Sequence, residues 1–403
     1  GFGLVDKYIK SNMCMMPWIS METTPTGEYR PCCMYEDTIK DEKGDAYNTV
    51  NHTLQEVMQS KFMKDLRKEF SEGKRPVGCF QCWKQEDAGN DSKRTHMWLK
   101  APVVGQVHIT KDMVAPVLID FKLGNICNLK CRICWAGSSS QWATENIKTD
   151  PGSETKWRRL LKEGAWPRKQ NKFFESLEDA LPHIRFFEIT GGEPLMIKEQ
   201  FDVLRKCVER GYAKNIDVHY NTNGTHFPEK ELNEIWPHFK RIELAYSIDD
   251  VGARFEYQRH PAKWDNVNEN ILKFKNSGLA NLSTQVCTTM NLFNIAYVDE
   301  LAPYIDEWQP DFWYMNTLHQ PIEFDLQQLP KHVKDKIVEK LSQSKLRKQE
   351  MNTAIQYLNS EPKQVMDDYK NAVTERIKTI DTARQENFKD VFPFLNKLLE
   401  IYD

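Results

Sequence analysis

The chain has 403 residues, with 55 Lys and Arg against 58 Asp and Glu, which gives a formal net charge of −3. This near balance gives no electrostatic basis for nucleic acid or an anionic membrane as the main partner. Neither a run of about 18 apolar residues nor a signal-peptide pattern at the start is present. We therefore expect a soluble, cytoplasmic protein with one large domain and additions to it.

The chain contains ten cysteines, most of which fall into clusters separated by long stretches without cysteine. Disulfides would suit a small secreted domain, whereas clusters in a chain of this length favour metal binding in a reducing compartment. Cys207 and Cys287 stand apart in apolar segments. We interpret both as small buried hydrophobic residues.

The first cysteine cluster is spread over the N-terminal region. Thr24-Pro-Thr-Gly27 has the composition of a hairpin turn. Further on, Thr53 and Glu56 form a capping box, and apolar residues at four-residue intervals then predict a helix that Gly73 to Pro76 should end. A hairpin and a helix end can bring four thiols together, and these are Cys14, Cys32, Cys79 and Cys82. Cys33 is left as a spare, and a four-cysteine zinc knot stays open as the alternative to an iron-sulfur cluster.

The second cluster has the spacing C-x3-C-x2-C and consists of Cys127, Cys131 and Cys134. It directly follows a strand predicted at 117–123. A closed structural zinc or iron-sulfur site normally uses four protein ligands. Three thiolates would leave one iron of a cluster open to another ligand, so this site is predicted to be reactive rather than purely structural.

From residue 116 the sequence alternates between strands and helices. Strands are predicted at 117–123, 184–190, 216–221, 241–248, 282–288 and 312–318, and helices at 173–181, 199–210, 228–236, 264–276 and 295–305. This alternation predicts a parallel sheet with right-handed crossovers. Beyond residue 321 the chain is charged and helical, with periods at 334–346, 351–357, 364–385 and 392–402. We interpret this part as a helical cap, with peptide or partner binding as the alternative.

Short polar motifs follow several of the predicted strands. They are Gly191-Gly192-Glu193-Pro194, Tyr220-Asn-Thr-Asn223-Gly, and Ser247-Ile-Asp249 with Arg259 ten residues later. In α/β barrels the carboxyl ends of the strands form the active site. Ordinary turns are the alternative for any one motif taken alone, but the order and spacing of the whole set favour one shared site.

The three-cysteine run and the motifs that follow it, in this order, resemble the radical S-adenosylmethionine (SAM) superfamily. The resemblance implies a partial (β/α)6 barrel and a 4Fe-4S cluster on Cys127, Cys131 and Cys134 with SAM on the open iron. Cys14-x12-Gly27-x4-Cys32 resembles the first motif of the SPASM and twitch auxiliary-cluster domains, which usually follow the barrel and here precede it. We predict an auxiliary domain at 1–100, the barrel at 101–322 and a helical extension at 323–403.

The resemblance also implies roles for single residues. Glu193 would meet the ammonium group of SAM, Arg259 its carboxylate, and Asn223 and Ser247 its ribose. The residues assigned to cofactor binding are Gly191, Gly192, Glu193, Pro194, Asn223, Ser247, Asp249 and Arg259. Asn316 and His319, near the end of the last strand, are the candidate substrate contacts.

We expect an enzyme that cleaves SAM to a 5′-deoxyadenosyl radical and abstracts hydrogen from a peptide or a small molecule. An auxiliary 4Fe-4S cluster on Cys14, Cys32, Cys79 and Cys82 would assist net oxidation or crosslinking, and a flavodoxin or ferredoxin would supply electrons. The other hypothesis is a non-catalytic iron-sulfur or zinc-stabilised protein for binding or electron transfer. Such a protein would not need the SAM-directed residues.

Overall fold

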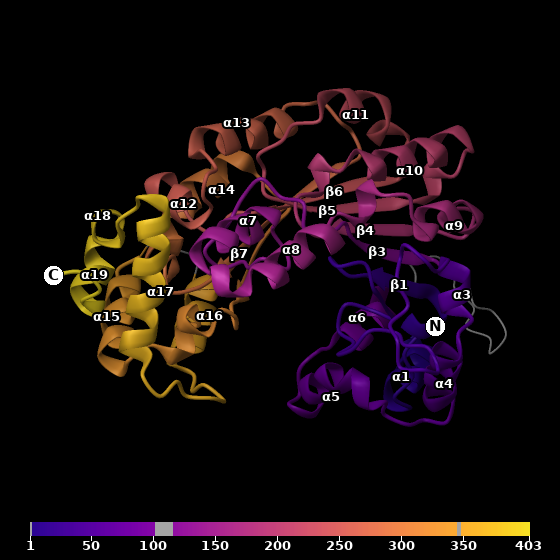
Figure 1. The fold of residues 1–403 in the computed structure, drawn as a ribbon, viewed down its shortest axis with the longest axis horizontal. Coiled ribbons are helices and arrows are strands. Elements are labelled where there is room, and N and C mark those ends of the chain that lie inside the picture. The colour runs from indigo at the N-terminus through magenta and orange to yellow at the C-terminus, as the bar shows by residue number, and fades with distance from the viewer. Residues whose placement is uncertain (1, 101–115, 345–347) are drawn as a thin grey trace. The chain divides into compact units, whose positions relative to one another are not determined.

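The computed structural model describes residues 2–100, 116–344 and 348–403 (Figure 1). It is an α/β protein with a mostly parallel sheet, a cysteine-rich N-terminal region and a helical C-terminal region. Its contacts divide the chain into two compact units. The first unit contains residues 1–126, 158–220 and 228–243, and the second contains 127–157, 221–227 and 244–403.

The sheet of the first unit contains the N-terminal hairpin as well as barrel strands. Its order is β2 (Tyr29–Arg30), β1 (Ser20–Thr23), β3 (Leu118–Lys122), β4 (Phe186–Thr190) and β5 (Asp217–Thr222). The hairpin turns at Gly27, whose φ of +93° suits glycine. β1 then pairs in parallel with β3, with Ser20 opposite Leu118. The hairpin is therefore part of the main sheet, which the sequence did not predict.

Helices of the N-terminal region bring its cysteines together. They are α1 (Phe2–Lys10), α2 (Met16–Ile19), α3 (Leu54–Met58), α4 (Lys61–Ser71), α5 (Phe80–Asp87) and α6 (Lys93–Lys100). The single helix predicted after Thr53 is two helices, because Ser60 starts a second one by accepting a hydrogen bond from the backbone N–H of Met63. As predicted, Thr53 caps α3, and the chain leaves α4 through Gly73 at a φ of +74°.

One face of the first unit's sheet is apolar and covered by a helix. Phe173 of α9 (Lys172–Ala180) packs against Phe121 of β3, with ring centroids 5.5 Å apart. Phe187 of β4 stacks on the same Phe121 at 5.2 Å. The first unit also contains α10 (Lys198–Glu209), α11 (Glu229–Glu234) and α8 (Glu154–Glu163) from residue 158 on.

The second unit carries the end of β6 (Arg241–Ser247) from residue 244 on, and all of β7 (Leu282–Met290) and β8 (Phe312–Thr317), which pair in parallel. Its helices up to residue 308 are α7 (Ser140–Thr149), α12 (Gly252–Gln258), α13 (Trp264–Lys275) and α14 (Ala302–Trp308). The six predicted strands are β3 to β8, each within two residues of its predicted ends. The sequence did not predict α7 and α8.

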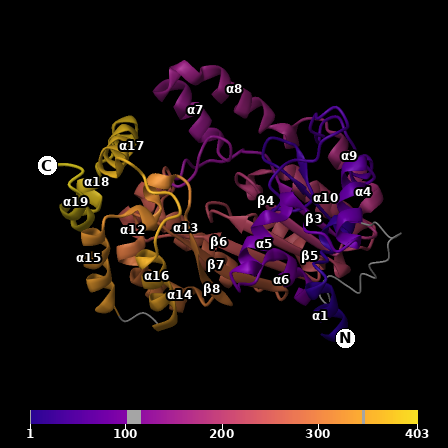
Figure 2. The ribbon, with the colours of Figure 1, turned by 90° about the horizontal axis from the view of Figure 1, so that it is seen from below.

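The C-terminal helices pack as one apolar cluster in the second unit. They are α15 (Lys331–Ser342), α16 (Lys348–Asn359), α17 (Tyr369–Arg384), α18 (Phe388–Val391) and α19 (Pro393–Leu399) (Figure 2). Phe293, Phe324 and Phe392 are buried within this cluster, together with Tyr257 of α12. The packing agrees with a helical cap, although residues 345 and 346 of the first predicted helix lie outside the described residues.

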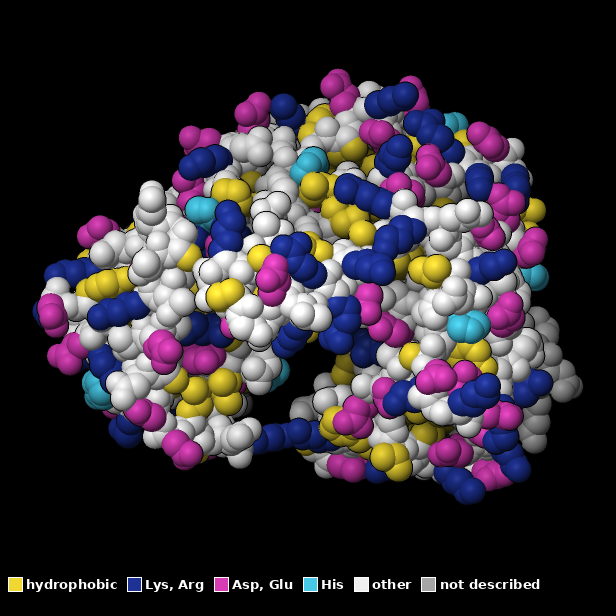
Figure 3. Space-filling view, in the orientation of Figure 1, with side chains coloured by type: hydrophobic (Ala, Val, Ile, Leu, Met, Phe, Trp, Pro, Cys, Tyr) yellow, Lys and Arg dark blue, Asp and Glu magenta, His cyan; other side chains and the backbone are white. Residues whose placement is uncertain are grey.

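The described surface is strongly charged and of mixed sign. On the face that Figure 3 shows, Lys and Arg side chains are interspersed with Asp and Glu. Within the described residues, we find no helix with the length and apolar character that crossing a membrane requires.

Candidate metal centres

Four cysteines converge in the first unit. Cys14, Cys32, Cys79 and Cys82 line one small cavity together with Met16, Met34, Tyr35, Phe70, Trp83, Lys93 and Arg94. Burial raises the pKa of Cys14 to about 12, and the nearby thiol of Cys82 adds to this. Burial likewise raises the pKa of the Cys79 thiol, and the nearby thiols of Cys14, Cys32 and Cys82 raise it further. The four thiols therefore lie within electrostatic reach of one another, as the hairpin and the helix end predicted.

The surroundings of these thiols suit a centre of four thiolates. A bound metal would deprotonate the thiols and leave a negative centre, and two cationic side chains line the cavity. Arg94 is held there by Glu86, by the backbone oxygen of Met13 at 2.9 Å and by the ring of Trp83. Lys93 is the second cation. The donor set and the charges therefore fit such a centre.

Cys33 points elsewhere. Its Sγ lies within 4.8 Å of carboxylate oxygens of Glu22 and Asp120. These carboxylates belong to β1 and β3, so the thiol faces the sheet. This orientation agrees with the interpretation of Cys33 as a spare.

The three-cysteine loop lies in the second unit and is held by its backbone. The backbone N–H groups of Lys130 and Arg132 donate to the carbonyl oxygens of His260 and Gln258, at 2.7 and 2.8 Å. Trp142 of α7 donates from Nε1 to the carbonyl oxygen of Cys131 at 2.7 Å. Burial raises the pKa of Cys134 to about 12, and the Cys131 thiol adds to this. Hydrogen bonds to and from its backbone thus fix the loop.

A buried charge from the C-terminal region holds the same loop. Arg132 is fully buried, donates to Oδ1 of Asp381 in α17 at 2.7 Å, and lies 3.8 Å from the ring of Tyr257. Asp381 also accepts hydrogen bonds from the hydroxyls of Tyr257 and Tyr402, at 2.6 and 2.8 Å. The sequence contains no local signal for this pair, because 249 residues separate its members.

Arg259 lies beside the three-cysteine loop. Its Nη2 and Nε donate to Oδ2 of Asp249 at 2.8 and 3.2 Å, and its Nη1 lies 3.7 Å from Sγ of Cys131. Burial disfavours the charge of Arg259, but the Asp249 carboxylate outweighs burial and raises the pKa of Arg259 above its ordinary value. A fixed positive charge therefore faces a predicted cluster ligand.

Cys287 belongs to these surroundings too. It is half-buried, and its Sγ accepts a hydrogen bond from Nδ2 of Asn316 at 3.2 Å. The interpretation as a buried hydrophobic residue is therefore wrong for Cys287, because polar groups surround it. It is confirmed for Cys207, which is 0% exposed.

Asn223 connects the turn after β5 to the cysteine loop. Its Nδ2 donates to Oδ1 of Asn128 at 3.0 Å, and its own Oδ1 accepts from the backbone N–H of Thr225 at 3.0 Å. Ser247 lies at the end of β6, two residues before Asp249. In the second unit, the structure thus brings Asn223, Asp249 and Arg259 to residues in or next to the cysteine loop.

The glycines of Gly191-Gly192-Glu193-Pro194 allow close packing in the first unit. A Cβ on Gly191, whose φ is +97°, would lie 2.4 Å from the backbone nitrogen of Leu123. A Cβ on Gly192 would lie 2.1 Å from the carbonyl oxygen of Ile126. Pro194 starts a short 3-10 turn, and Glu193 is 1% exposed. Both glycines are therefore required by the backbone that leads into Cys127.

The two candidate substrate residues have different neighbours. Asn316 contacts Cys287, as described above. The side chain of His319 is 69% exposed, with Nδ1 3.8 Å from Oδ2 of Asp325. Of the two residues, Asn316 therefore has a described contact with Cys287, near Arg259, whereas His319 is mostly exposed to solvent.

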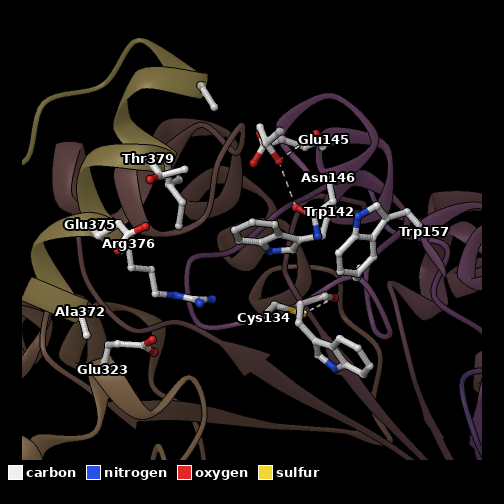
Figure 4. Close-up of a pocket in the computed structure, with 15 residues that line it drawn as sticks. Cys134, Trp142, Glu145, Asn146, Trp157, Glu323, Ala372, Glu375, Arg376 and Thr379 are labelled. Carbon is white, nitrogen blue, oxygen red and sulfur yellow. Dashed lines mark hydrogen bonds between the residues drawn. The ribbon is translucent and has the colours of Figure 1, made fainter. Parts of the chain in front are cut away.

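A cavity of about 520 Å³ opens beside Cys134 in the second unit (Figure 4). Trp142 and Trp157 line it from one side, and residues of α17 such as Arg376 from the other. Trp135 lines the same cavity. Trp135 is 53% exposed. A Cβ on Gly137 would come within 2.1 Å of its ring, so this glycine makes room for the indole.

Comparison with known families finds two matches, and each matched region contains one of the two cysteine sets. Residues 121–305 match the family model of the radical SAM superfamily, and residues 14–83 match that of the SPASM iron-sulfur cluster-binding domain. The chain thus contains a region that matches the radical SAM domain and, ahead of it, a region that matches the SPASM domain, in the order that the sequence predicted. These domains imply a 4Fe-4S cluster, SAM and auxiliary iron-sulfur binding.

One curated relative is the sporulation killing factor maturation protein SkfB of Bacillus subtilis (strain 168). It is 22% identical over 215 residues, which are 53% of this chain and 45% of SkfB. The chain thus spans about half the length of this relative.

Two solved structures are also similar. Native anSMEcpe with bound AdoMet and Cp18Cys peptide is 16% identical, with a TM-score of 0.37 over 56% of this chain and 58% of that one. Streptococcus suis SuiB bound to precursor peptide SuiA is 14% identical, with a TM-score of 0.35 over 81% of this chain and 60% of that one.

Proposed function

We propose that this chain is an enzyme that cleaves SAM reductively and abstracts a hydrogen atom from a substrate. The observation that carries the proposal is one loop with three half-buried thiols, Cys127, Cys131 and Cys134, next to the fixed cation of Arg259. When bound, the cluster and SAM supply the 5′-deoxyadenosyl radical. The protein supplies ligands, orientation and exclusion of water.

The protein's own residues would bind and orient SAM. Asp249 holds the guanidinium of Arg259, which in this proposal meets the carboxylate of SAM. Glu193 would accept hydrogen bonds from the ammonium group, and Asn223 and Ser247 would contact the ribose. Gly191, Gly192 and Pro194 would position this segment through their packing on 123–126. The second hypothesis, a non-catalytic metal-stabilised protein, gives no reason for this set of residues.

The four-thiol site would serve electron transfer in a net oxidation or crosslinking. Hydrogen abstraction leaves a substrate radical that must lose one more electron to become a closed-shell product. With Cys14, Cys32, Cys79 and Cys82 all bound to iron, the substrate could not bind this centre directly. The remaining role is that of an electron acceptor.

Two variants test this assignment against the zinc alternative. Cys79→Ala with Cys82→Ala should remove the iron of the auxiliary site and spare that of the three-cysteine site. Cys33→Ala is the matched control and should keep all iron. Metal analysis of wild-type protein that finds one zinc and iron for only one cluster would reject the auxiliary iron-sulfur site.

A peptide is the substrate class that we favour, with a small molecule as the alternative. The relative SkfB is by name a maturation protein, which supports a polypeptide substrate. Asn316 is the stronger proposed substrate contact and His319 the weaker one, since His319 is largely exposed. We place the enzyme in the cytoplasm, because cysteine-bound clusters suit a reducing compartment.

The electron donor, a flavodoxin or a ferredoxin, would dock at the cavity beside Cys134. A proposed ligand of the radical cluster lines this cavity, so a donor bound there comes close to the cluster. Exposed aromatic side chains such as Trp135 are enriched at protein interfaces. Reduced, reconstituted protein mixed with SAM should form 5′-deoxyadenosine, which tests the proposed function as a whole.

A further inference from the structure

A row of charged side chains crosses the sheet of the first unit. The strand registers place Arg30 opposite Glu22, Glu22 opposite Asp120, and Asp120 opposite Glu188. Successive residues of a strand point to opposite faces. The row therefore lies on the face opposite Phe121, which packs under α9. A charged row on one face of a central sheet is unusual and needs a function.

The row adjoins the four-thiol site through two contacts. Lys93 of α6 lines the four-thiol cavity, and its Nζ lies 3.9 Å from Oε1 of Glu188. Cys33 is the second contact, because its Sγ lies within 4.8 Å of Glu22 and Asp120 and it directly follows Cys32 in the chain. A change of charge at the four-thiol site will therefore act on the row.

Asp120 is less well compensated than its neighbour Glu22. Glu22 is paired with Arg30 and, at 2.9 Å, with Lys122. Asp120 is 4% exposed, and the Nζ of the same Lys122 is 3.4 Å away from it. Burial raises the pKa of Asp120 to about 8; Lys122 opposes this rise, while Glu188 and Glu22 add to it. A carboxyl group of this kind changes its protonation near neutral pH.

We propose that Asp120 takes up a proton when the auxiliary iron-sulfur site accepts an electron. The inference rests on the proposed function. In a two-electron oxidation of the substrate, one hydrogen atom goes to the 5′-deoxyadenosyl radical, one electron to the auxiliary site and one proton to the Asp120 carboxylate, which becomes a carboxylic acid. The charged and titratable groups that face Asp120 are Glu22, Arg30, Cys33, Lys93, Lys122 and Glu188.

The expected coupling is moderate. Two unit charges about 10 Å apart, at an effective dielectric constant of about 20, interact by on the order of one pKa unit. One added electron should therefore change the proton affinity of Asp120 about tenfold. By linkage, the equilibrium constant for reduction of the auxiliary site also changes tenfold between low and high pH. For one electron this corresponds to a change of about 59 mV in the reduction potential.

The test is a redox titration of the full reconstituted protein, with the auxiliary site monitored by electron paramagnetic resonance at several pH values. The midpoint potential should fall by about 59 mV in total as the pH rises through about 8. Asp120→Asn should remove this dependence. Asp217→Asn is the matched control, since Asp217 is a buried carboxylate that lies opposite Phe186 instead of Glu188. It should keep the pH dependence.

A second measurement on wild-type protein avoids the risk that Asp120→Asn does not fold. At a pH just above 8, where the Asp120 carboxylate of oxidised protein is largely ionised, the infrared difference spectrum between reduced and oxidised protein should contain a new carboxylic acid C=O band. Absence of this band, a pH-independent potential, or a pH dependence that persists in Asp120→Asn would each overturn the role of Asp120. Wild-type protein with no iron at the four-thiol site would instead contradict the auxiliary cluster of the proposed function.

Discussion

Arg259 and Asp249 form a buried ion pair next to the three-cysteine loop. Two nitrogens of the guanidinium donate to one carboxylate oxygen, and the third lies 3.7 Å from Sγ of Cys131. The other oxygen of Asp249 accepts from the backbone N–H of Thr289 at 2.9 Å. The backbone of β7 thus anchors Asp249, and Asp249 in turn directs the guanidinium of Arg259 toward a cluster ligand.

Asp249→Asn should weaken SAM binding without loss of iron. Hydrogen bonds to charged groups contribute about 1.5–3 kcal/mol, so we expect the affinity to fall on the order of 10- to 100-fold. Isothermal titration with SAM measures this. Asp250→Asn is the control, because Asp250 pairs with Arg254 instead. Equal losses in both variants would contradict the role given to Asp249.

Asp381→Ala should destabilise the second unit. It would remove the buried carboxylate partner of Arg132 and leave only the partly exposed Glu386, at 3.1 Å, and breaking a buried pair costs up to about 3–5 kcal/mol. Urea unfolding should show this loss, and iron retention at the three-cysteine site should fall with it. Glu375→Gln, an exposed change on the same helix, should behave like wild type. An unchanged unfolding midpoint in Asp381→Ala would rule out a structural role for the pair.

The folded protein should lose stability as the pH rises from about 4 to about 8. The pKa of Asp120 is raised to about 8 by burial, so its neutral form stabilises the fold at low pH and ionisation removes that contribution as the pH passes through the folded pKa. Asp250, whose pKa burial raises to about 7, acts in the same direction. Free energies of unfolding across this range should therefore decline less steeply in Asp120→Asn. Parallel curves for the variant and wild type would argue against the raised pKa.

Trp135→Ala should slow SAM cleavage driven by reduced flavodoxin and spare cleavage driven by dithionite. The indole is 53% exposed at the cavity beside Cys134, where a protein donor would contact it, whereas a small reductant needs no docking surface. Initial rates of 5′-deoxyadenosine formation with each reductant provide the comparison. Val365→Ala, also exposed in the second unit, is the control. A proportional loss with both reductants would mean that Trp135 acts on the cluster itself.

The barrel strands and both thiol sets could be predicted because their signals are local. Apolar runs bounded by turn residues place β3 to β8, and turns at Gly27 and Gly73 bring Cys14 and Cys32 toward Cys79. Long-range pairings carry no such signal. The parallel pairing of β1 with β3 depends on residues about a hundred positions apart, and the Arg132–Asp381 pair on residues 249 apart.

Asp120 is a different case, because its signal was present in the sequence. Asp120 stands in the apolar strand predicted at 117–123, so the sequence alone indicates that this carboxylate is buried. Its significance depends on Glu22 and Glu188, which only the strand registers place beside it.

The most direct test of the central claim is SAM cleavage by wild-type protein and by the variant with Cys127, Cys131 and Cys134 all changed to alanine. Under dithionite, reconstituted wild type should form 5′-deoxyadenosine. The triple variant should form none while it keeps the iron of the four-thiol site. Formation of 5′-deoxyadenosine by the triple variant would contradict the account.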